Sequence, residues 1–280
     1  MRFLWIVLLT LQMFVLQAVD VTVWVHGTYP ALRVLSASWC PVRSKVYVNP
    51  GLTLAKKLPK NYYHYQLSEF MHNLDPILYN HDHFYTYGWH SSNVRPKQRI
   101  KEGKKLYHAL QKLINKYKKK HEDIMLRVIG FSHGGNVILN MASHLPFKQK
   151  NQKLHIILIG TPVQESARNF INNPYITKAY SFYSDGDWIQ KIDVQKFHHN
   201  CPKDAPFLSQ RVFKDSDNVQ QISFTLNGKK IGHTGFRGIL KYLPDMMSQI
   251  EKKLVDLPHN ETLKFDYVVP GKSKKRKKNK

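Results

Sequence analysis

Two kinds of apolar pattern alternate along most of this chain. Short runs rich in β-branched and aromatic residues, typical of buried strands, are separated by stretches whose apolar positions recur every three or four residues, as on one face of a helix. The strand-like runs lie at 21–26, 84–89, 124–129, 154–159, 178–183 and 222–226, and the helix-like stretches at about 65–74, 96–120, 136–142 and 238–254. Strands that alternate with helices predict an α/β fold: a doubly wound, mostly parallel sheet in a single domain.

Two of the helix-like stretches have a clear apolar face. In 96–120 lysines fill the outer face, and the apolar positions are Ile100, Leu106, Leu110, Leu113, Ile114 and Tyr117. In the closing helix 238–254 they are Ile239, Leu240, Leu243, Met246, Met247 and Ile250. The run 154–159 is almost continuously apolar, which is typical of a parallel strand covered on both faces.

The segment Gly130-Phe131-Ser132-His133-Gly134 joins a strand-like run to a helix-like run. This is the G-x-S-x-G pattern in a strand–turn–helix context, where a serine sits on a sharp, strained turn that lifts its hydroxyl clear of the backbone. Bulky side chains two positions on either side would clash with the neighbouring strand and helix. A serine between glycines is often only a turn, but this context predicts a nucleophile at Ser132.

A base and an acid for that serine follow other strands. His233 comes shortly after the last strand, and both Asp185 and Asp187 come directly after the strand 178–183. Because the carboxyl ends of parallel strands meet at one edge of a sheet, these side chains are expected to lie near Ser132. The order serine, aspartate, histidine along the chain suits an acyl-transfer triad.

Turn chemistry favours Asp187 over Asp185 as the acid. In Asp187-Trp188-Ile189 an apolar residue two positions on can pin the loop to the core, whereas Asp185-Gly186 resembles a turn former. The choice between the two aspartates stays open at this point.

Acyl transfer also needs hydrogen-bond donors for the oxyanion. One candidate is the backbone N–H of His133, directly after the nucleophile. The other is the backbone N–H of Thr28, in the loop His26-Gly27-Thr28 after the first strand, where Gly27 lets the backbone approach a substrate closely. We therefore expect Thr28 and His133 to form the oxyanion hole.

Taken together, these segments resemble the α/β-hydrolase superfamily, and most closely its lipase and esterase branches. The resemblance covers about 21–254 and is carried by His26-Gly27, Gly130–Gly134, Gly160-Thr161-Pro162, Ser184–Asp187 and Gly232-His233. It implies the α/β-hydrolase fold, and Gly160-Thr161-Pro162 is similar to a segment of many lipases. The long segment between the first strand and Phe84 departs from the family pattern and leaves the shape of an acyl pocket open.

The resemblance implies a serine hydrolase that cleaves acyl esters through Ser132, Asp187 and His233, with no cofactor and no metal. The pair His198-His199 near Cys201 supplies too few ligands for a metal site. One alternative is a thioesterase or amidase that uses the same triad. Another is a non-catalytic protein on a hydrolase scaffold that binds an anionic partner; the complete triad argues against it.

The formal net charge of +24 is extreme, and seven of the nine residues from Lys272 to Lys280 are basic. Such a surface attracts anionic partners, among them the surface of an anionic membrane. A general lysine bias with a solvated surface explains the charge equally well. A nucleic-acid role would rest on charge alone, because no nucleic-acid module is recognisable. Oligomeric state is not indicated.

The chain begins with one basic residue and an apolar run, so 1–19 resembles a signal peptide and predicts export; an uncleaved anchor or a buried first element is the alternative. The hydrolase domain is expected at 20–256, with 191–220 as a lid or a passive insertion, and a basic tail at 257–280. In an exported protein Cys40 and Cys201 can pair, or they are two unrelated thiols.

Overall fold

The computed structural model describes residues 18–28, 46–92, 95–120, 124–148, 152–195, 201–214, 216, 218–257 and 261–270. The strands of this part form one sheet of nine, in the order β2-β3-β1-β4-β5-β6-β7-β8, with β9 also paired to β7. The parallel strands are β1 (Val19–Val25), β3 (Phe84–Gly88), β4 (Ile124–Phe131), β5 (Lys153–Ile159), β6 (Lys178–Tyr183), β7 (Val219–Leu226) and β9 (Leu263–Tyr267). The two antiparallel strands are β2 (Gly51–Leu54) and β8 (Lys229–Lys230).

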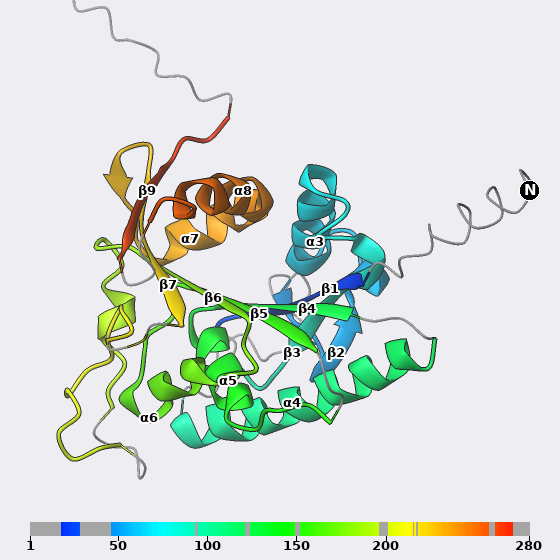
Figure 1. Ribbon diagram of the computed structural model, residues 1–280, viewed down its shortest axis with the longest axis horizontal. Helices are drawn as coiled ribbons and strands as arrows, with labels where there is room; N and C mark the ends of the chain where they lie inside the picture. Colours follow the sequence, from blue (N-terminus) through cyan, green and yellow to red (C-terminus); the bar gives the residue numbers. More distant parts are fainter. Residues whose placement is uncertain are drawn as a thin grey trace, which may run out of the picture.

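Helices cover both faces of this sheet (Figure 1). On one face lie α4 (Pro96–Lys118), α5 (His133–Ala142) and α6 (Glu165–Arg168), and on the other α3 (Tyr63–Leu74), α7 (His233–Ile239) and α8 (Leu243–Leu254). Short 3₁₀ turns are η2 (Ala55–Lys57), η3 (His81–His83), η4 (Asn169–Asn172), η5 (Ile189–Lys191) and η6 (Leu240–Tyr242). The predicted α/β class, with a doubly wound and mostly parallel sheet, is confirmed.

The chain reverses its direction of travel across the sheet at β1. It leaves β1 for β3 on one side and then returns for β4 on the other side. In open α/β sheets, ligands bind outside the carboxyl ends of the strands at such a switch point. The loop after β1 and the turn after β4 lie there, so the topology places the two segments that carry Thr28 and Ser132 side by side.

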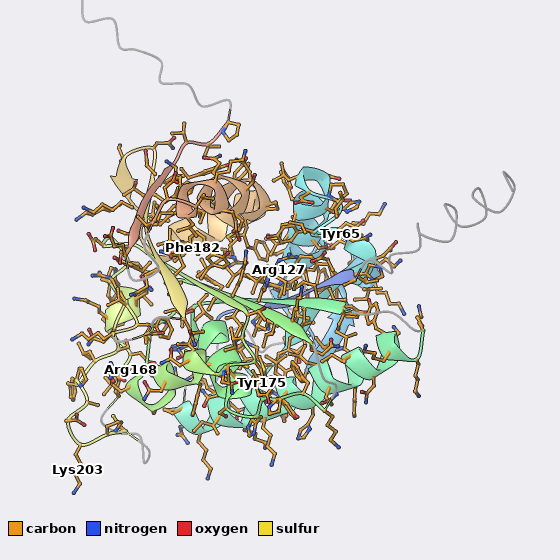
Figure 2. All side chains as sticks on the ribbon, viewed as in Figure 1. Tyr65, Arg127, Arg168, Tyr175, Phe182 and Lys203 are labelled. Atoms are coloured by element: carbon orange, nitrogen blue, oxygen red, sulfur yellow. The ribbon has the colours of Figure 1, made fainter. Side chains whose placement is uncertain are left out.

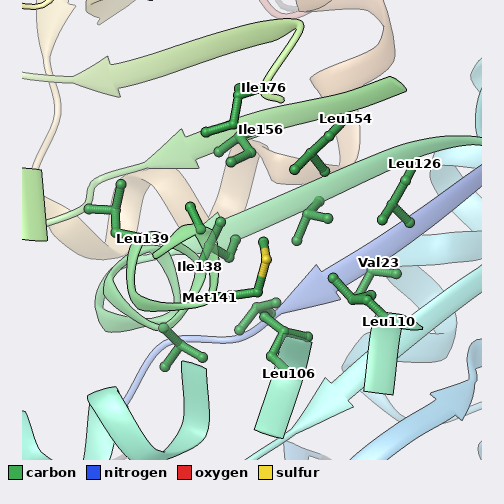
Figure 3. Packing of buried hydrophobic residues seen from close by; sticks show 14 of the residues in the cluster. Val23, Leu106, Leu110, Leu126, Ile138, Leu139, Met141, Leu154, Ile156 and Ile176 are labelled. Atoms are coloured by element: carbon green, nitrogen blue, oxygen red, sulfur yellow. The ribbon is translucent and has the colours of Figure 1, made fainter. Parts of the chain in front are cut away.

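One half of the core lies between the central strands and the helices α4 and α5. Figure 3 shows Val23, Leu126 and Leu154 from the strands facing Leu106 of α4 and Met141 of α5. The two helices touch closely because residue 103 is glycine: a Cβ there would lie 2.6 Å from the Cβ of Asn140. This close contact brings the first turn of α4 towards the amino end of α5.

The apolar face predicted for the helix 96–120 is wrong at its first position. Ile100 is 42% exposed, and the neighbouring Arg99 is fully buried. Positions 99, 103, 106 and 110 follow one another at helical spacing, so they share the face that packs on the sheet and on α5. A charged residue therefore occupies a place that the pattern assigned to isoleucine.

The closing helix predicted at 238–254 is divided. It comprises the end of α7, the turn η6 and the helix α8. Pro244 lies in the first turn of α8, where its missing N–H is tolerated; it cannot continue a preceding helix. His233 thereby becomes the first residue of a separate short helix, α7.

The sheet continues beyond the expected domain boundary at 256. Leu263, Phe265 and Tyr267 of β9 are buried, while Lys264 and Asp266 between them are exposed. This alternation, with a period of two, is that of a strand with one covered face. The sheet therefore includes residues 263–267, which the sequence pattern assigns to the basic tail. Residues 271–280 lie outside the described part, as do Cys40, His198-His199 and most of the expected leader.

Within the described residues, no helix has the length and apolar character needed to span a bilayer.

Candidate active site

Ser132 lies on a sharp turn between β4 and α5, as predicted. Its backbone has φ 54° and ψ −132°, and its N–H bonds to the carbonyl oxygen of Ile159 at 2.9 Å. The only other described non-glycine residue with positive φ is Asn227, in an Asn-Gly turn that favours this conformation. Turn chemistry does not favour it at a serine, and strain of this kind clusters at functional sites.

Two glycines around Ser132 make the turn possible. A Cβ at Gly130 would lie 2.8 Å from the backbone of Gly135, and a Cβ at Gly134 would lie 2.3 Å from the carbonyl oxygen of Val25. Real side chains do not approach backbone atoms this closely. The glycines of the G-x-S-x-G pattern are therefore explained by packing against α5 and β1.

The structure brings His233 and Asp187 together. The Nδ1–H of His233 donates to Oδ2 of Asp187 at 2.7 Å, and the Asp187 side chain is fully buried. Asp185 instead forms an ion pair with Lys230 at 3.3 Å, and its side chain is half exposed. Of the two candidate acids, Asp187 is the one that orients the histidine.

Gln190, and not the expected Ile189, holds the loop that carries Asp187. Ile189, the expected pin, is only half-buried. Gln190 is fully buried, its N–H bonds to Oδ1 of Asp187 at 3.3 Å, and its side chain donates to the carbonyl oxygen of Thr161 at 3.1 Å. Gln190 thus links the two segments: its backbone N–H bonds to the Asp187 carboxylate, and its side chain bonds to the loop after β5.

Asp187 and His233 lie against Gly160, and the backbone of Ser132 bonds to the residue before it. A Cβ at Gly160 would lie 3.3 Å from Oδ2 of Asp187 and 3.5 Å from Cε1 of His233. Ser132 bonds to Ile159, the residue before this glycine, and the ring of His233 stacks on Phe131 with centroids 4.9 Å apart. The turn that carries Ser132 and the side chains of Asp187 and His233 therefore lie close together at the carboxyl ends of β4, β5 and β6.

The loop after β1 lies against the same turn. A Cβ at Gly27 would lie 2.9 Å from Cβ of Ser132, so only glycine fits there without a shift. Trp89 donates to the carbonyl oxygen of His26 at 2.8 Å, and Nδ1 of His26 bonds to the Gly27 carbonyl oxygen at 2.8 Å. Burial lowers the pKa of His26 to about 4, so this ring is neutral. Thr28 follows directly, and His133 begins α5 on the other side of Ser132.

A buried polar group behind Ser132 was missed in the sequence. Arg99 of α4 contacts both His133 and Asp193, and Gln164 donates to the same Asp193 carboxylate. Because Arg99 lies among lysines in the sequence, the pattern assigns it to the solvent-exposed face of the helix. The signal that could have found it is its helical spacing from Gly103 and Leu106, which places it on the buried face.

Neither the known protein families nor the curated proteins include one that matches the chain. Among solved structures, it is similar to the crystal structure of the gene lin2722 product from Listeria innocua, with 14% sequence identity and a TM-score of 0.39. That similarity covers 89% of this chain and 98% of the Listeria chain.

The segment after β6 is tied to the body of the protein near the site. Within this segment Val194 and Leu208 form an isolated antiparallel bridge, and Gln210 forms another with Val163, after β5. Figure 2 shows Lys203 at the outer end of this excursion. Whether 191–220 acts as a lid stays a prediction, and so does the pairing of Cys201 with Cys40. Within the described residues no group of three His, Cys, Asp or Glu side chains is arranged to hold a metal.

Proposed function

We propose that this protein is a serine hydrolase of the α/β-hydrolase superfamily that cleaves acyl esters, as lipases and carboxylesterases do. One observation carries the proposal: Ser132 sits on a strained turn with positive φ whose N–H bonds to Ile159, and the hydrogen-bonded pair Asp187–His233 lies against the next residue, Gly160. A nucleophile, an oriented base and a buried acid at one edge of a parallel sheet are the parts that acyl transfer needs.

In the proposed mechanism, Oγ of Ser132 attacks the acyl carbonyl carbon. His233 donates its Nδ1–H to Asp187, so its Nε2 is the atom that accepts the serine proton. The N–H groups of Thr28 and His133 stabilise the oxyanion of the tetrahedral intermediate. His233 returns the proton to the leaving alcohol, and water then attacks the acyl-enzyme, with His233 again accepting a proton.

The surface near the site suits a lipid interface. Trp188, directly after Asp187, is 63% exposed, and Ile192 and Leu208 in the same segment after β6 are also exposed. Together with the net charge of +24, these apolar side chains favour a substrate presented at an anionic membrane surface. Export to such a surface is part of this proposal. If vesicle binding depended neither on lipid charge nor on salt concentration, the proposed anionic membrane surface would be ruled out.

Turnover of matched oxygen-ester, thioester and amide substrates tests the proposal. An ester hydrolase should turn over the oxygen ester fastest, and Ser132→Ala and His233→Ala should abolish this turnover while the protein stays folded. Faster cleavage of the thioester or the amide would favour a thioesterase or an amidase. No turnover by the folded parent, with binding to anionic vesicles unchanged in Ser132→Ala, would favour a non-catalytic binding protein.

A further inference from the structure

A single nitrogen of Arg99 joins two segments of the site. Its Nη1 lies 2.6 Å from Nδ1 of His133 and 2.8 Å from Oδ2 of Asp193. Arg99 comes from the first turn of α4, His133 follows Ser132 directly, and Asp193 lies six residues after Asp187 in the segment that follows β6. The arginine side chain is 1% exposed and that of Asp193 is 16% exposed, so the contact is shielded from water.

The chemistry of arginine fixes the state of His133. A guanidinium has only donors, so Nδ1 of His133 must be the unprotonated nitrogen, and the neutral ring carries its proton on Nε2. Four groups from different elements face this ring: Arg99 from α4, Asp193 from the segment after β6, Asn136 from α5 and His233 from α7. Burial first, and then the charges of Arg99 and His233, hold the pKa of His133 well below its usual range.

Arg99 has few other partners. Its Nε and Nη2 have no hydrogen-bond partner within the described residues. Asp193 is therefore the carboxylate that balances a charge taken fully out of water. Asp193 is held in turn by the Gln164 side chain, and its carbonyl oxygen accepts from the N–H of Ser209 at 2.9 Å. The position of the cation thus depends on the segment after β6.

We propose that Arg99 and Asp193 are positioning residues for the hydrolase site, which link the loop of the acid Asp187 to His133 and so hold the oxyanion amide in register with the triad. This inference rests on the proposed function. Neither residue touches the reacting atoms; both act through His133 and through the backbone of the segment after β6. Loss of either one should misplace the donors of the oxyanion, which are used fully only in the transition state.

Steady-state kinetics test this link, with the oxygen ester that the parent protein turns over fastest as the substrate. Arg99→Met and Asp193→Asn should each lower kcat about tenfold or more, with KM changed less than about twofold. The double variant should be no slower than Arg99→Met alone, because both substitutions remove the same Arg99–Asp193 interaction. Arg99→Lys, which keeps a donor and the charge, should recover part of the loss. Arg127→Met is the matched control, since it removes another buried arginine that is paired with an aspartate elsewhere in the sheet.

The dependence of kcat on pH separates this role from a loss of folding. In Arg99→Met the acid limb should move to higher pH, because His133 loses the cation that disfavours its protonated form. In Arg99→Lys the limb should stay where it is in the parent. Thermal unfolding identifies variants that fail to fold. If Arg99→Met is among them, Asp193→Asn and Arg99→Lys decide.

Three results would overturn the inference. Folded Arg99→Met and Asp193→Asn proteins with the kcat and KM of the parent would show that the link does nothing for the reaction. A loss in Arg99→Met with none in Asp193→Asn would remove the bridge to the segment after β6. A parent protein that turns over no ester would overturn the proposed function and this inference with it, and it is distinguished from the first two by the inactivity of the unmodified chain.

Discussion

Among the described residues, two arginine–aspartate pairs have a buried arginine, and the two pairs differ in what surrounds them. Arg99–Asp193 and Arg127–Asp20 have similar distances, 2.8 and 3.2 Å, and both arginine side chains are almost fully buried. Arg127 lies on the opposite face from α4, near α3 and α8 (Figure 2). It donates to the carbonyl oxygen of Leu78 at 2.7 Å and sits over the ring of Tyr79.

The partners explain the difference. Arg127 contacts a carbonyl group and an aromatic ring, which stabilise its positive charge and belong to no residue of the candidate site. Arg127 and Asp20 also border a cavity of about 540 Å³ whose lining includes none of Ser132, Asp187 and His233. Arg99 instead contacts the residue that follows the proposed nucleophile. We therefore expect the Arg127–Asp20 pair to contribute to stability alone, and the Arg99–Asp193 pair to contribute to both stability and catalysis.

The largest effect should come from the acid at the carboxyl ends of the strands. Asp187→Asn should lower kcat about 10³- to 10⁴-fold, because the amide no longer holds the His233 ring in the tautomer that accepts a proton at Nε2. Asp185→Asn is the matched control, since Asp185 pairs with Lys230. It should stay within about twofold of the parent. A loss of kcat in Asp185→Asn as large as that in Asp187→Asn would contradict the assignment of Asp187 as the acid.

The second arginine pair should affect stability alone. Arg127→Met leaves Asp20 without its cation and removes the donor to Leu78, so the free energy of unfolding should fall by about 2–3 kcal/mol. Urea unfolding measures this loss. The kcat of the folded variant should match the parent within about twofold. A tenfold loss of kcat would break the contrast between the two pairs.

The smallest effect per residue concerns three histidines: His26 after β1 and His64 in α3 are buried, and His155 in β5 is partly buried. Burial lowers the pKa of His26 to about 4 and that of His64 to about 3, and burial likewise lowers the pKa of His155, beside the cavity, to about 4. The unfolded chain binds these protons first, so stability is full above about pH 6.5 and is lost as the pH falls towards 4. The neutral burial of His26 and of His64 should each lower the free energy of unfolding by about 1 kcal/mol at pH 5.5 relative to pH 7.5.

Urea unfolding at pH 7.5 and pH 5.5 checks this expectation. His64→Gln should remove one share of the difference, since glutamine can still accept from Trp24 and donate to Val46 but does not titrate. A pH dependence in this variant equal to that of the parent would show that His64 is not neutral in the folded protein.

The sequence predicts those parts of the site that local chemistry determines. Ser132 is recognisable because strand, turn and helix follow one another within a few residues, and Asp187 and His233 because each follows a strand. Arg99 is not recognisable in this way. Its burial depends on Gly103, which lets α4 approach α5, and its charge is balanced by Asp193, which lies far away in the sequence.

Two fold details show the same limit. The end of the closing helix pattern was predicted correctly, but the break before Pro244 was not, because the apolar face continues across it. Strand β9 was assigned to the tail, because a five-residue alternation beside a basic run is a weak signal until its partner β7 is known. Pairing between distant segments supplies what the local pattern lacks.

Labelling with a fluorophosphonate probe tests the central claim most directly. Such a probe reacts with a serine that is activated by a base and an oxyanion hole. Mass spectrometry of the labelled parent should place the adduct on Ser132, and Ser132→Ala and His233→Ala should remain unlabelled. A folded parent that does not label, or an adduct on another serine, would contradict the assignment of Ser132, Asp187 and His233 as a catalytic triad.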